Sequence, residues 1–331
     1  MNFSPIKLFI IGRNRRLILF VCGIIILTLI YYSEQILISS LVYVEIRNLV
    51  VSQRNLLSPH VNIIDLQKES RENFSCIKTK RLLNITQTTI CLHDIRDAVS
   101  RQIAEEKVWE EKLLTQLLIV LQRYPQMNFF DVGANIGSYT MFVASLGRQV
   151  IAIECFKPNI DRIRKAIQIE NVEKNVILIG NAIHEETGRY FKMTSDPENV
   201  GSQAVLPKTI VQQTEYDDIY VVKTIQFDEI LPILKIRNVR QAIMKVDIQW
   251  AEIYLCQTGN KTFEYVNIPV ILMEWDLGSR LFDRFDSLSK CFFNRGYFAT
   301  SDLCRLLPNS EALKTWPADI YWMKMNLTGI C

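Results

Sequence analysis

The stretch NFFDVGANIGSYTMFVASLG, residues 128–147, decides the fold. An apolar run ends at Asp131, a turn with Gly133, Asn135 and Gly137 follows, and an apolar-periodic segment begins near Tyr139. This order predicts a strand, a tight turn and a helix. Glycine lets the turn take positive φ and lets a ligand approach the backbone. The helix start offers N–H groups and a partial positive charge to a carboxylate or phosphate.

Strands and helices continue to alternate beyond this stretch. Leu113, Leu117 and Leu121 lie on one helical stripe in a helix predicted from Ala98 to Arg123, which Pro125 ends. Near-continuous Val/Ile/Leu strands between helices indicate a parallel sheet covered on both faces. The predicted class is therefore α/β, doubly wound. The predicted strands are NFFDV, QVIAIEC, NVILIGNA, the start of VVKTIQFDEIL, AIMKVDI and PVILMEWD, and GYFATSD and ADIYWMK form a closing pair.

Glu154 ends the second predicted strand, 23 residues after Asp131. An acid at this place accepts hydrogen bonds from both ribose hydroxyls, which favours a nucleoside-bearing cofactor. Asn135 replaces the second glycine of a dinucleotide fingerprint, and no lysine follows Gly137 as a P-loop requires. A ligand with a single carboxylate, such as the methionine part of S-adenosylmethionine, fits better. A strand-turn-helix without any ligand is the alternative.

From about Asp97 to Trp322 the chain resembles the FkbM-type methyltransferases, a branch of the class I fold that uses S-adenosylmethionine. The resemblance implies a mostly parallel, seven-stranded, Rossmann-like sheet over residues 97–331. AVSRQIAEEKVWE is similar to the lead-in of animal membrane-anchored members. The other carriers, in order, are DVGANIGSYT, VIAIECFKPN, GNAI, GSQAV, TIQFDEIL, KVDIQWAE and ILMEWD.

The resemblance also implies roles for single residues. Glu154 should hold the ribose, Asn181 and Ala182 should face the adenine, and Asp247 should stand nearest the sulfonium and the acceptor. The turn should line the methionine end of the cofactor through Asp131, Gly133, Ala134, Asn135, Gly137 and Ser138.

Three residues are candidates for taking a proton from an acceptor hydroxyl. Asp247 ends the fourth predicted strand and Glu274 ends the fifth, while His184 follows NAI. Each also has a simpler interpretation. Asp247 would only orient the cofactor, Glu274 would cap the following loop, and His184 would be an exposed loop residue. No metal is predicted, although Asp247 and Glu274 leave a Mg²⁺ site open. Tyr139 and Trp275 either line the acceptor pocket or pack in the core.

One motif departs from the family pattern K-[IV]-D-[VI]-E-G-x-E. Gln249 and Trp250 replace the acid and the glycine that the family carries after Asp247. Loss of a carboxylate beside the acceptor can remove a base or a substrate hydrogen bond. Tryptophan either narrows the pocket or offers a stacking face to a sugar ring. The departure therefore bears on the identity of the substrate and on activity itself.

The N-terminus predicts a membrane anchor. The run LILFVCGIIILTLIYY, residues 17–32, contains no charge and can extend through Ile38. The first sixteen residues carry four cations and no acid, which places them in the cytoplasm. We expect a cytoplasmic tail over 1–16, an uncleaved signal anchor over 17–38 and a lumenal stem over 39–96; a cleaved signal peptide is the alternative. The rest of the chain is close to neutral, so the net charge of +3 indicates topology and not nucleic-acid binding.

Sequons and cysteines agree with a lumenal, oxidising address in the Golgi or endoplasmic reticulum. The sequons begin at Asn73, Asn84, Asn260 and Asn326. Cys155 is expected to be a buried free thiol, and Cys22 lies in the predicted span. Short spacing favours the pairs Cys76–Cys91 and Cys291–Cys304, which leaves Cys256–Cys331.

The sequence thus predicts a single-pass type II membrane protein that uses S-adenosylmethionine to methylate a hydroxyl, by family analogy that of a glycan. A catalytically inactive relative that acts as a lumenal binding or scaffold protein is a rival, motivated by Gln249 and Trp250. A Golgi glycosyltransferase ranks last, because the chain has no Asp-x-Asp for a metal and nucleotide sugar.

Overall fold

A computed structural model describes residues 58–69, 72–196, 198–211, 218–275, 282–308 and 310–324. The predicted tail (1–16) and signal anchor (17–38) lie outside these ranges. Within them, no helix combines the length and the apolarity needed to cross a membrane.

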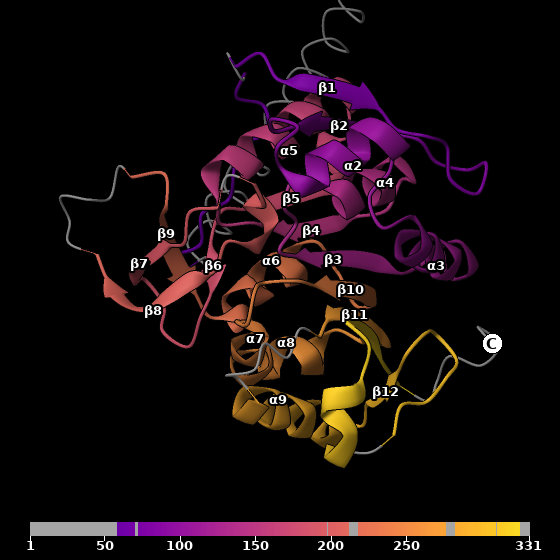
Figure 1. The fold of residues 1–331 in the computed structure, drawn as a ribbon, viewed down its shortest axis with the longest axis vertical. Helices are drawn as coiled ribbons and strands as arrows, with labels where there is room; N and C mark the ends of the chain where they lie inside the picture. The colour runs from indigo at the N-terminus through magenta and orange to yellow at the C-terminus, as the bar shows by residue number, and fades with distance from the viewer. Residues whose placement is uncertain are drawn as a thin grey trace, which may run out of the picture. The chain divides into compact units, whose positions relative to one another are not determined.

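Seven strands form the central sheet in the order β12–β13–β11–β10–β3–β4–β5 (Figure 1). The strands run parallel except β13, which is antiparallel to β11 and β12. The chain proceeds outward from β3 to β5 and then returns to β10, so strand order reverses between β3 and β10. The predicted doubly wound, mostly parallel sheet is confirmed. The strands are β3 Asn128–Val132, β4 Val150–Ile153, β5 Val176–Ile179, β10 Ala242–Val246, β11 Val270–Glu274, β12 Phe298–Thr300 and β13 Asp319–Met323.

Helices cover both faces of this sheet because its strands are apolar on both sides. Phe129 and Phe130, adjacent on β3, belong to two different hydrophobic cores. The Phe129 core includes α3 Glu111–Arg123, α4 Ser138–Ser145 and α5 Lys157–Glu170. The Phe130 core includes α6 Leu231–Ile236, α7 Glu252–Thr258, α8 Asn260–Tyr265 and α9 Phe282–Asn294.

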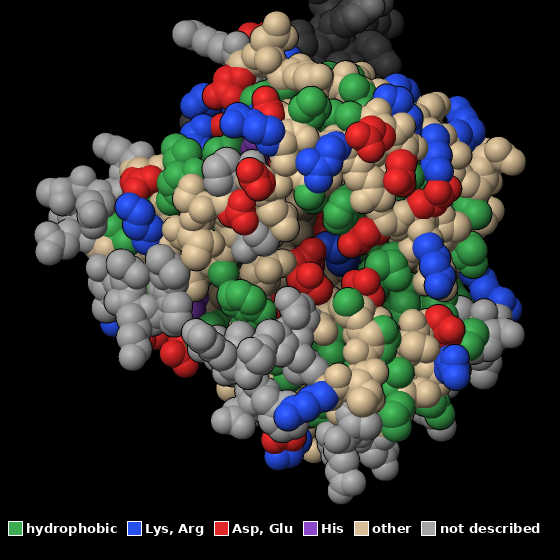
Figure 2. Space-filling model, viewed as in Figure 1, with side chains coloured by type: hydrophobic (Ala, Val, Ile, Leu, Met, Phe, Trp, Pro, Cys, Tyr) green, Lys and Arg blue, Asp and Glu red, His purple; other side chains and the backbone are tan. Residues whose placement is uncertain are grey.

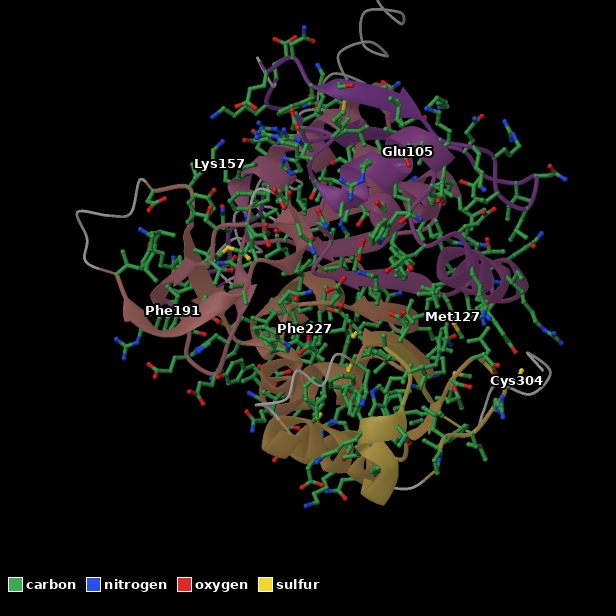
Figure 3. The ribbon with its side chains drawn as sticks, in the orientation of Figure 1. Glu105, Met127, Lys157, Phe191, Phe227 and Cys304 are labelled. Atoms are coloured by element: carbon green, nitrogen blue, oxygen red, sulfur yellow. A yellow bond between two sulfur atoms is a disulfide. The ribbon has the colours of Figure 1, made fainter. Side chains whose placement is uncertain are left out.

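A second sheet of four strands, in the order β6–β9–β7–β8, lies beside the edge of the main sheet (Figure 1). Its strands are β6 Ala182–Ile183, β7 Tyr190–Met193, β8 Val205–Ile210 and β9 Val221–Ile225. Figure 3 shows Phe191 on this sheet, apart from Phe227, which packs 6.4 Å from Phe130 in the main core. The sequence predicts neither β7 nor β8, and it merges β5 and β6 into one strand, which Gly180 and Asn181 interrupt.

The described part of the predicted stem packs onto the domain. A hairpin of β1 Ser75–Lys78 and β2 Thr89–Leu92 is closed by the predicted Cys76–Cys91 disulfide, and β2 contacts α5. Upstream, Ile64 N donates to Leu178 O, and Gly180 N donates to Asn62 O. Residues 58–64 therefore extend the edge of the main sheet beside β5.

The predicted helix from Ala98 to Arg123 is two helices, α2 Ala98–Glu106 and α3. Lys107 and Glu110 take the left-handed conformation with φ of 64° and 45°, and they break the helix between them. Val108 is buried at this break, whereas Trp109 and Glu110 are half-buried. The apolar stripe predicts the helix type correctly but contains no signal for the break.

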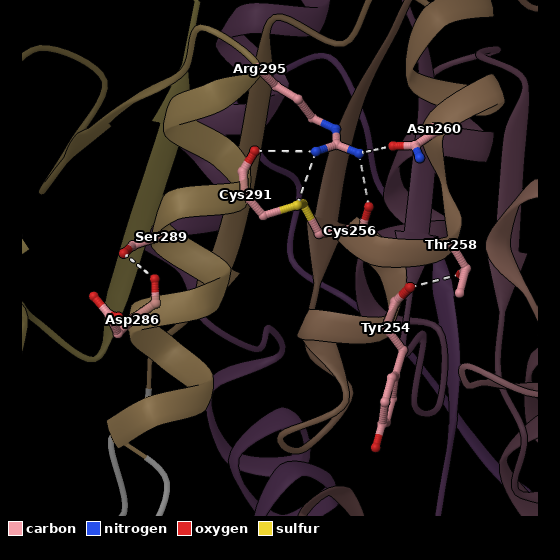
Figure 4. Close-up of a disulfide and its surroundings, with 8 residues drawn as sticks. All are labelled: Tyr254, Cys256, Thr258, Asn260, Asp286, Ser289, Cys291 and Arg295. Atoms are coloured by element: carbon pink, nitrogen blue, oxygen red, sulfur yellow. Dashed lines mark hydrogen bonds between the residues drawn. A yellow bond between two sulfur atoms is a disulfide. The ribbon is translucent and has the colours of Figure 1, made fainter.

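The predicted pairs Cys291–Cys304 and Cys256–Cys331 are wrong, because Cys256 of α7 and Cys291 of α9 bond to each other (Figure 4). Arg295 fixes the geometry by donating to the carbonyl oxygens of both cysteines and to Asn260 Oδ1. Contact between the helices, which sequence spacing does not encode, selects the partners. Cys304 is disulfide-bonded as well. Cys155 is a free thiol as expected, but it is half-buried and not buried.

Candidate functional site

The glycine turn after β3 is locked to the neighbouring strand. Gly133 N and Ala134 N donate to Ile153 O, Asn135 N donates to Glu154 Oε2 at 2.8 Å, and Gly137 N donates to Ala134 O. These four amides are therefore used within the protein. The expectation that they hold the cofactor carboxylate does not fit this geometry.

Gly133 also sets the contact between β3 and the end of β10. Its φ is +84°, and an added Cβ would lie 1.8 Å from the Asp247 carbonyl oxygen. No side chain fits at that distance, so the turn and the Asp247 backbone touch directly. This contact places Asp247 beside the turn at the point where strand order reverses, as the sequence predicts for a doubly wound sheet.

Asp131 lies beneath the turn. It is 1% exposed, and its Oδ2 accepts hydrogen bonds from Thr140 N at 2.9 Å and Thr140 Oγ1 at 2.6 Å. Burial raises the pKa of Asp131. The carboxyl group thus caps the first turn of α4 and lines neither of the cavities described below. Gly137, whose φ is +86°, gives the turn its backbone shape and likewise lines neither cavity.

Glu154 follows β4 and faces the turn. Its Oε2 accepts from Asn135 N and its Oε1 from Phe156 N, each at 2.8 Å. Burial raises the pKa of Glu154 to about 7, while the two amide donors oppose the shift. Each carboxylate oxygen has a second lone pair. The Asn159 side chain also hydrogen-bonds to this carboxylate, so only part of its acceptor capacity remains for a ribose diol.

A cavity of about 70 Å³ lies between this turn, Glu154 and the loop before β8. It contains six of the predicted cofactor-binding residues, as well as Phe156, Val200, Gly201 and Gln203. Asn135 Oδ1 and Gln203 Oε1 are buried there without a hydrogen-bond partner in the described structure. Unpaired buried acceptors of this kind call for a donor, which a nucleoside cofactor supplies. The six residues are Gly133, Asn135, Glu154, Asn181, Ala182 and Asp247.

This cavity is smaller than the usual ligand pocket of about 300–1,000 Å³. The wall from Val200 to Val205 is a 3-10 turn followed by a strand at the edge of the small sheet. Its anchor is Asp97, which caps α2 through Ser100 N and also accepts from Val200 N at 3.0 Å.

A second cavity, of about 320 Å³, shares Asn135, Gly201, Asp247 and Gln249 with the first. Figure 2 shows acidic side chains gathered around a basic one in a hollow of the face drawn. The charged lining residues are Glu110, Lys245, Asp247 and Glu274, and the predicted residues Ala134 and Ser138 lie on its wall. Ser138 Oγ is buried and has no partner in the described structure.

Gln249 joins the two carboxylates of this cavity. Its Nε2 donates to Asp247 Oδ1 at 3.0 Å and to Glu274 Oε2 at 2.9 Å. Burial and the neighbouring Asp247 charge raise the pKa of Glu274. Burial opposes ionisation of Asp247 too, but Lys245 at 3.0 Å holds the pKa of Asp247 below its ordinary value. The directions of the two shifts favour Asp247 as the carboxylate and Glu274 as the acid of this pair.

The departure from the family motif has a backbone consequence. Gln249 and Trp250 both take positive φ, 49° and 70°. Glycine, which the family carries at the second position, suits this conformation, whereas a bulky side chain is strained in it. The turn places Gln249 within hydrogen-bond distance of both Asp247 and Glu274.

Other predicted residues lie elsewhere. His184 is packed between the rings of Phe191 and Tyr254, 4.7 and 4.6 Å away, and lines neither cavity. Trp275 is 2% exposed and donates to Leu313 O in the core, so it does not line the acceptor pocket. Asn181 lines the first cavity, but its side chain binds the backbone of His60, Asn62 and Lys223.

Several cavity residues carry no role in the sequence-based prediction. Lys245, 7% exposed, lies 5.1 Å from the centre of the Tyr139 ring and neutralises Asp247. The loop residues Gly201 and Gln203 belong to the GSQAV motif, which is a signal for them. Trp109 and Glu110 reach the second cavity only because the helix breaks. Among the described residues, no group of three or more His, Cys, Asp or Glu can hold a metal.

Comparison with known proteins follows the geometry. The family model described as "Methyltransferase FkbM domain" matches residues 131–298, half of the 331-residue chain. No curated protein sequence matches the chain.

Solved structures similar to parts of this chain include three methyltransferases. A SAM-dependent methyltransferase from Agrobacterium tumefaciens is 8% identical with a TM-score of 0.38, over 78% of this chain and 72% of that one. A putative RNA methyltransferase from Pyrococcus horikoshii is 13% identical with a TM-score of 0.34, over 65% and 86%. A putative caffeoyl-CoA O-methyltransferase from Staphylococcus aureus is 11% identical with a TM-score of 0.35, over 68% and 90%. The family match assigns the chain: it belongs to the FkbM methyltransferases and is an S-adenosylmethionine-dependent methyltransferase.

Proposed function

We propose that the protein transfers a methyl group to an oxygen, and that the acceptor is a glycan hydroxyl. The observation that carries the proposal is the position of Asp247, which lines both cavities. A cofactor in the first cavity and an acceptor in the second would meet at this residue. When bound, S-adenosylmethionine supplies an electrophilic methyl group on a sulfonium.

The protein's own part in such a reaction is alignment and proton removal. Methyl transfer needs donor and acceptor in line and shielded from water, and a hydroxyl needs a base as its oxygen attacks. Asp247 is ionised at neutral pH and takes that proton. Glu274, protonated and held through Gln249, donates a hydrogen bond to the acceptor or to Asp247. Lys245 keeps Asp247 charged while the acceptor binds.

The lining of the second cavity supports a sugar as acceptor. Trp109, which is half-buried, offers a ring surface, while Asn135, Gln249 and the carboxylates offer hydrogen bonds. Aromatic side chains combine apolar area with polar tips, which suits ligands that have both apolar faces and hydroxyls. A volume of about 320 Å³ accommodates one or two sugar rings more readily than a protein segment.

We also propose that the protein acts in the secretory pathway, in the Golgi or endoplasmic reticulum, anchored by residues 17–38 with its catalytic domain in the lumen. Disulfides Cys76–Cys91 and Cys256–Cys291 favour an oxidising compartment. The sequon residues Asn73, Asn84 and Asn260 are exposed, as glycosylation requires. The charge pattern around residues 17–38 favours the type II orientation.

A silent relative that binds without catalysis is the second candidate, and Gln249 together with the small first cavity favours it. The test is incubation of the purified protein with labelled S-adenosylmethionine and a panel of glycans, lipids and peptides. We expect label on a sugar and at least a hundredfold loss with Asp247→Asn. Label on other acceptors alone would refute the glycan, and cofactor binding without any transfer would favour the silent relative.

A further inference from the structure

Part of the wall of the second cavity comes from residues that precede the stretch matched by the family model. Trp109 and Glu110 precede residue 131, where the family match begins, and both line the cavity. The left-handed turn at Lys107 and Glu110 brings them there, with Val108 buried behind them. Non-glycine residues held in this conformation are costly and concentrate at functional sites. The α2–α3 junction is therefore a candidate for a part of the acceptor site.

Glu110 faces the cavity with its charge only partly balanced. Its Oε2 accepts a hydrogen bond from Tyr139 OH at 2.8 Å, which is a neutral donor. Lys245 is the one cation among the described lining residues, and it already pairs with Asp247 at 3.0 Å. The cavity as a whole therefore carries net negative charge.

The charge of Glu110 raises the pKa values of neighbouring groups. Asp319 lies close by, and its pKa rises to about 6 because it is buried and because Glu110 is near. Burial and Glu110 also raise the pKa of Tyr139. An anionic ligand in the cavity would experience the same field.

The cavity wall also carries a buried hydroxyl group that can bind a polar ligand. Ser138 is 6% exposed, its Oγ has no partner in the described structure, and it lies on the cavity wall. A buried hydroxyl of this kind needs a ligand group or a water to satisfy it. A hydroxyl-bearing ligand meets this need without adding charge.

We propose that Glu110 and Trp109 select the acceptor, so that the enzyme methylates uncharged polyhydroxyl acceptors and rejects carboxylated or sulfated ones. The inference rests on the proposed function. Trp109 supplies the ring surface and Glu110 supplies both a hydrogen-bond acceptor and the repulsion. Like charges a few ångströms apart near a protein surface weaken association by about tenfold or more.

The test compares kcat/KM for matched acceptor pairs in the full-length protein. One pair is a hexoside and the corresponding uronic acid; the other is a non-sugar alcohol with and without a carboxylate. Glu110→Gln keeps the side-chain length, and Glu110→Asn suits the left-handed backbone, so that one variant covers a folding failure of the other. Glu111→Gln is the matched control, because Glu111 is the adjacent residue, is exposed at the start of α3 and pairs with Lys80.

We expect the wild type to favour the neutral member of each methylated pair by at least about tenfold, and both Glu110 variants to reduce this ratio about tenfold. Glu111→Gln should leave the ratio unchanged. Equal use of neutral and anionic acceptors by the wild type, or an unchanged ratio in the Glu110 variants, would overturn the inference. Selective transfer to the neutral non-sugar alcohol alone would refute the glycan and retain the charge filter. Transfer to none of the four refutes both.

Discussion

Two alanine substitutions measure how tightly the glycine turn is built against the end of β10. Gly133 and Gly147 have nearly the same φ, +84° and +81°, but different surroundings. A Cβ at Gly133 would meet the Asp247 carbonyl oxygen at 1.8 Å, whereas a Cβ at Gly147 would have no atom within 4 Å. The pair therefore separates the cost of the backbone conformation from the cost of the contact.

The magnitudes follow from these two terms. The left-handed conformation costs a non-glycine residue about 1–2 kcal/mol. Reduced freedom of the unfolded chain returns about 0.4–1 kcal/mol. Gly147→Ala should therefore lower the free energy of unfolding by about 1 kcal/mol. Gly133→Ala adds an overlap with rigid backbone, and overpacking costs about 1–3 kcal/mol. The contact is severe, so we expect a total loss of about 4 kcal/mol.

Equilibrium unfolding in urea, with the disulfides intact and tryptophan fluorescence as the signal, measures both losses. The m-values of the two variants must agree for the comparison to hold. Binding of S-adenosylhomocysteine should weaken in Gly133→Ala and stay unchanged in Gly147→Ala, because only the first moves Asp247. Equal destabilisation of the two variants would refute the close contact between turn and strand end.

Three further predictions concern the charges and the disulfide. Lys245→Met removes the cation beside Asp247, so the free energy of unfolding should fall by about 2–3 kcal/mol. The pKa of Asp247 should rise, and the acidic limb of the pH–rate profile should move to higher pH. An unmoved limb would argue against Asp247 as the base. The pKa of Glu154 is about 7 without ligand, and ribose hydroxyls favour its carboxylate form. The affinity for S-adenosylhomocysteine should therefore rise from pH 6 to pH 8, with a release of protons that calorimetry in two buffers detects. An affinity that does not depend on pH would contradict this prediction. Replacing Cys256 and Cys291 with serine opens a 35-residue loop and should cost about 3–4 kcal/mol, with non-reducing peptide mapping as the check on the pairing itself.

The sequence predicts the main sheet well because each buried strand is a nearly continuous apolar run with turn residues at its ends. NFFDV matches β3 residue for residue. The break between α2 and α3 has no such signal, because Lys107 and Glu110 are not residues that usually mark a left-handed turn. Strands β7 and β8 escape prediction since they carry mixed polar and apolar residues and depend on pairing with each other and, for β7, with β9.

The residues of the candidate site also divide into those that the sequence predicts and those that only the tertiary structure reveals. Gly133, Glu154 and Asp247 come from the ends of strands that are themselves predictable, so their meeting follows from the topology. Trp109 and Glu110 reach the cavity through the unpredicted helix break. The pairing of Cys256 with Cys291 depends on how α7 packs against α9, which spacing along the chain does not reveal.

Titration of S-adenosylhomocysteine into the wild type and Glu154→Gln at pH 8 tests the central claim most directly. The variant retains one oxygen but places an amide nitrogen against a backbone N–H, either that of Asn135 or that of Phe156. Loss of charge-assisted hydrogen bonds costs about 1.5–3 kcal/mol each. We predict one site per chain in the wild type and at least about tenfold weaker binding in the variant. No binding to the wild type, or equal binding to both proteins, would contradict a cofactor site between the turn after β3 and Glu154.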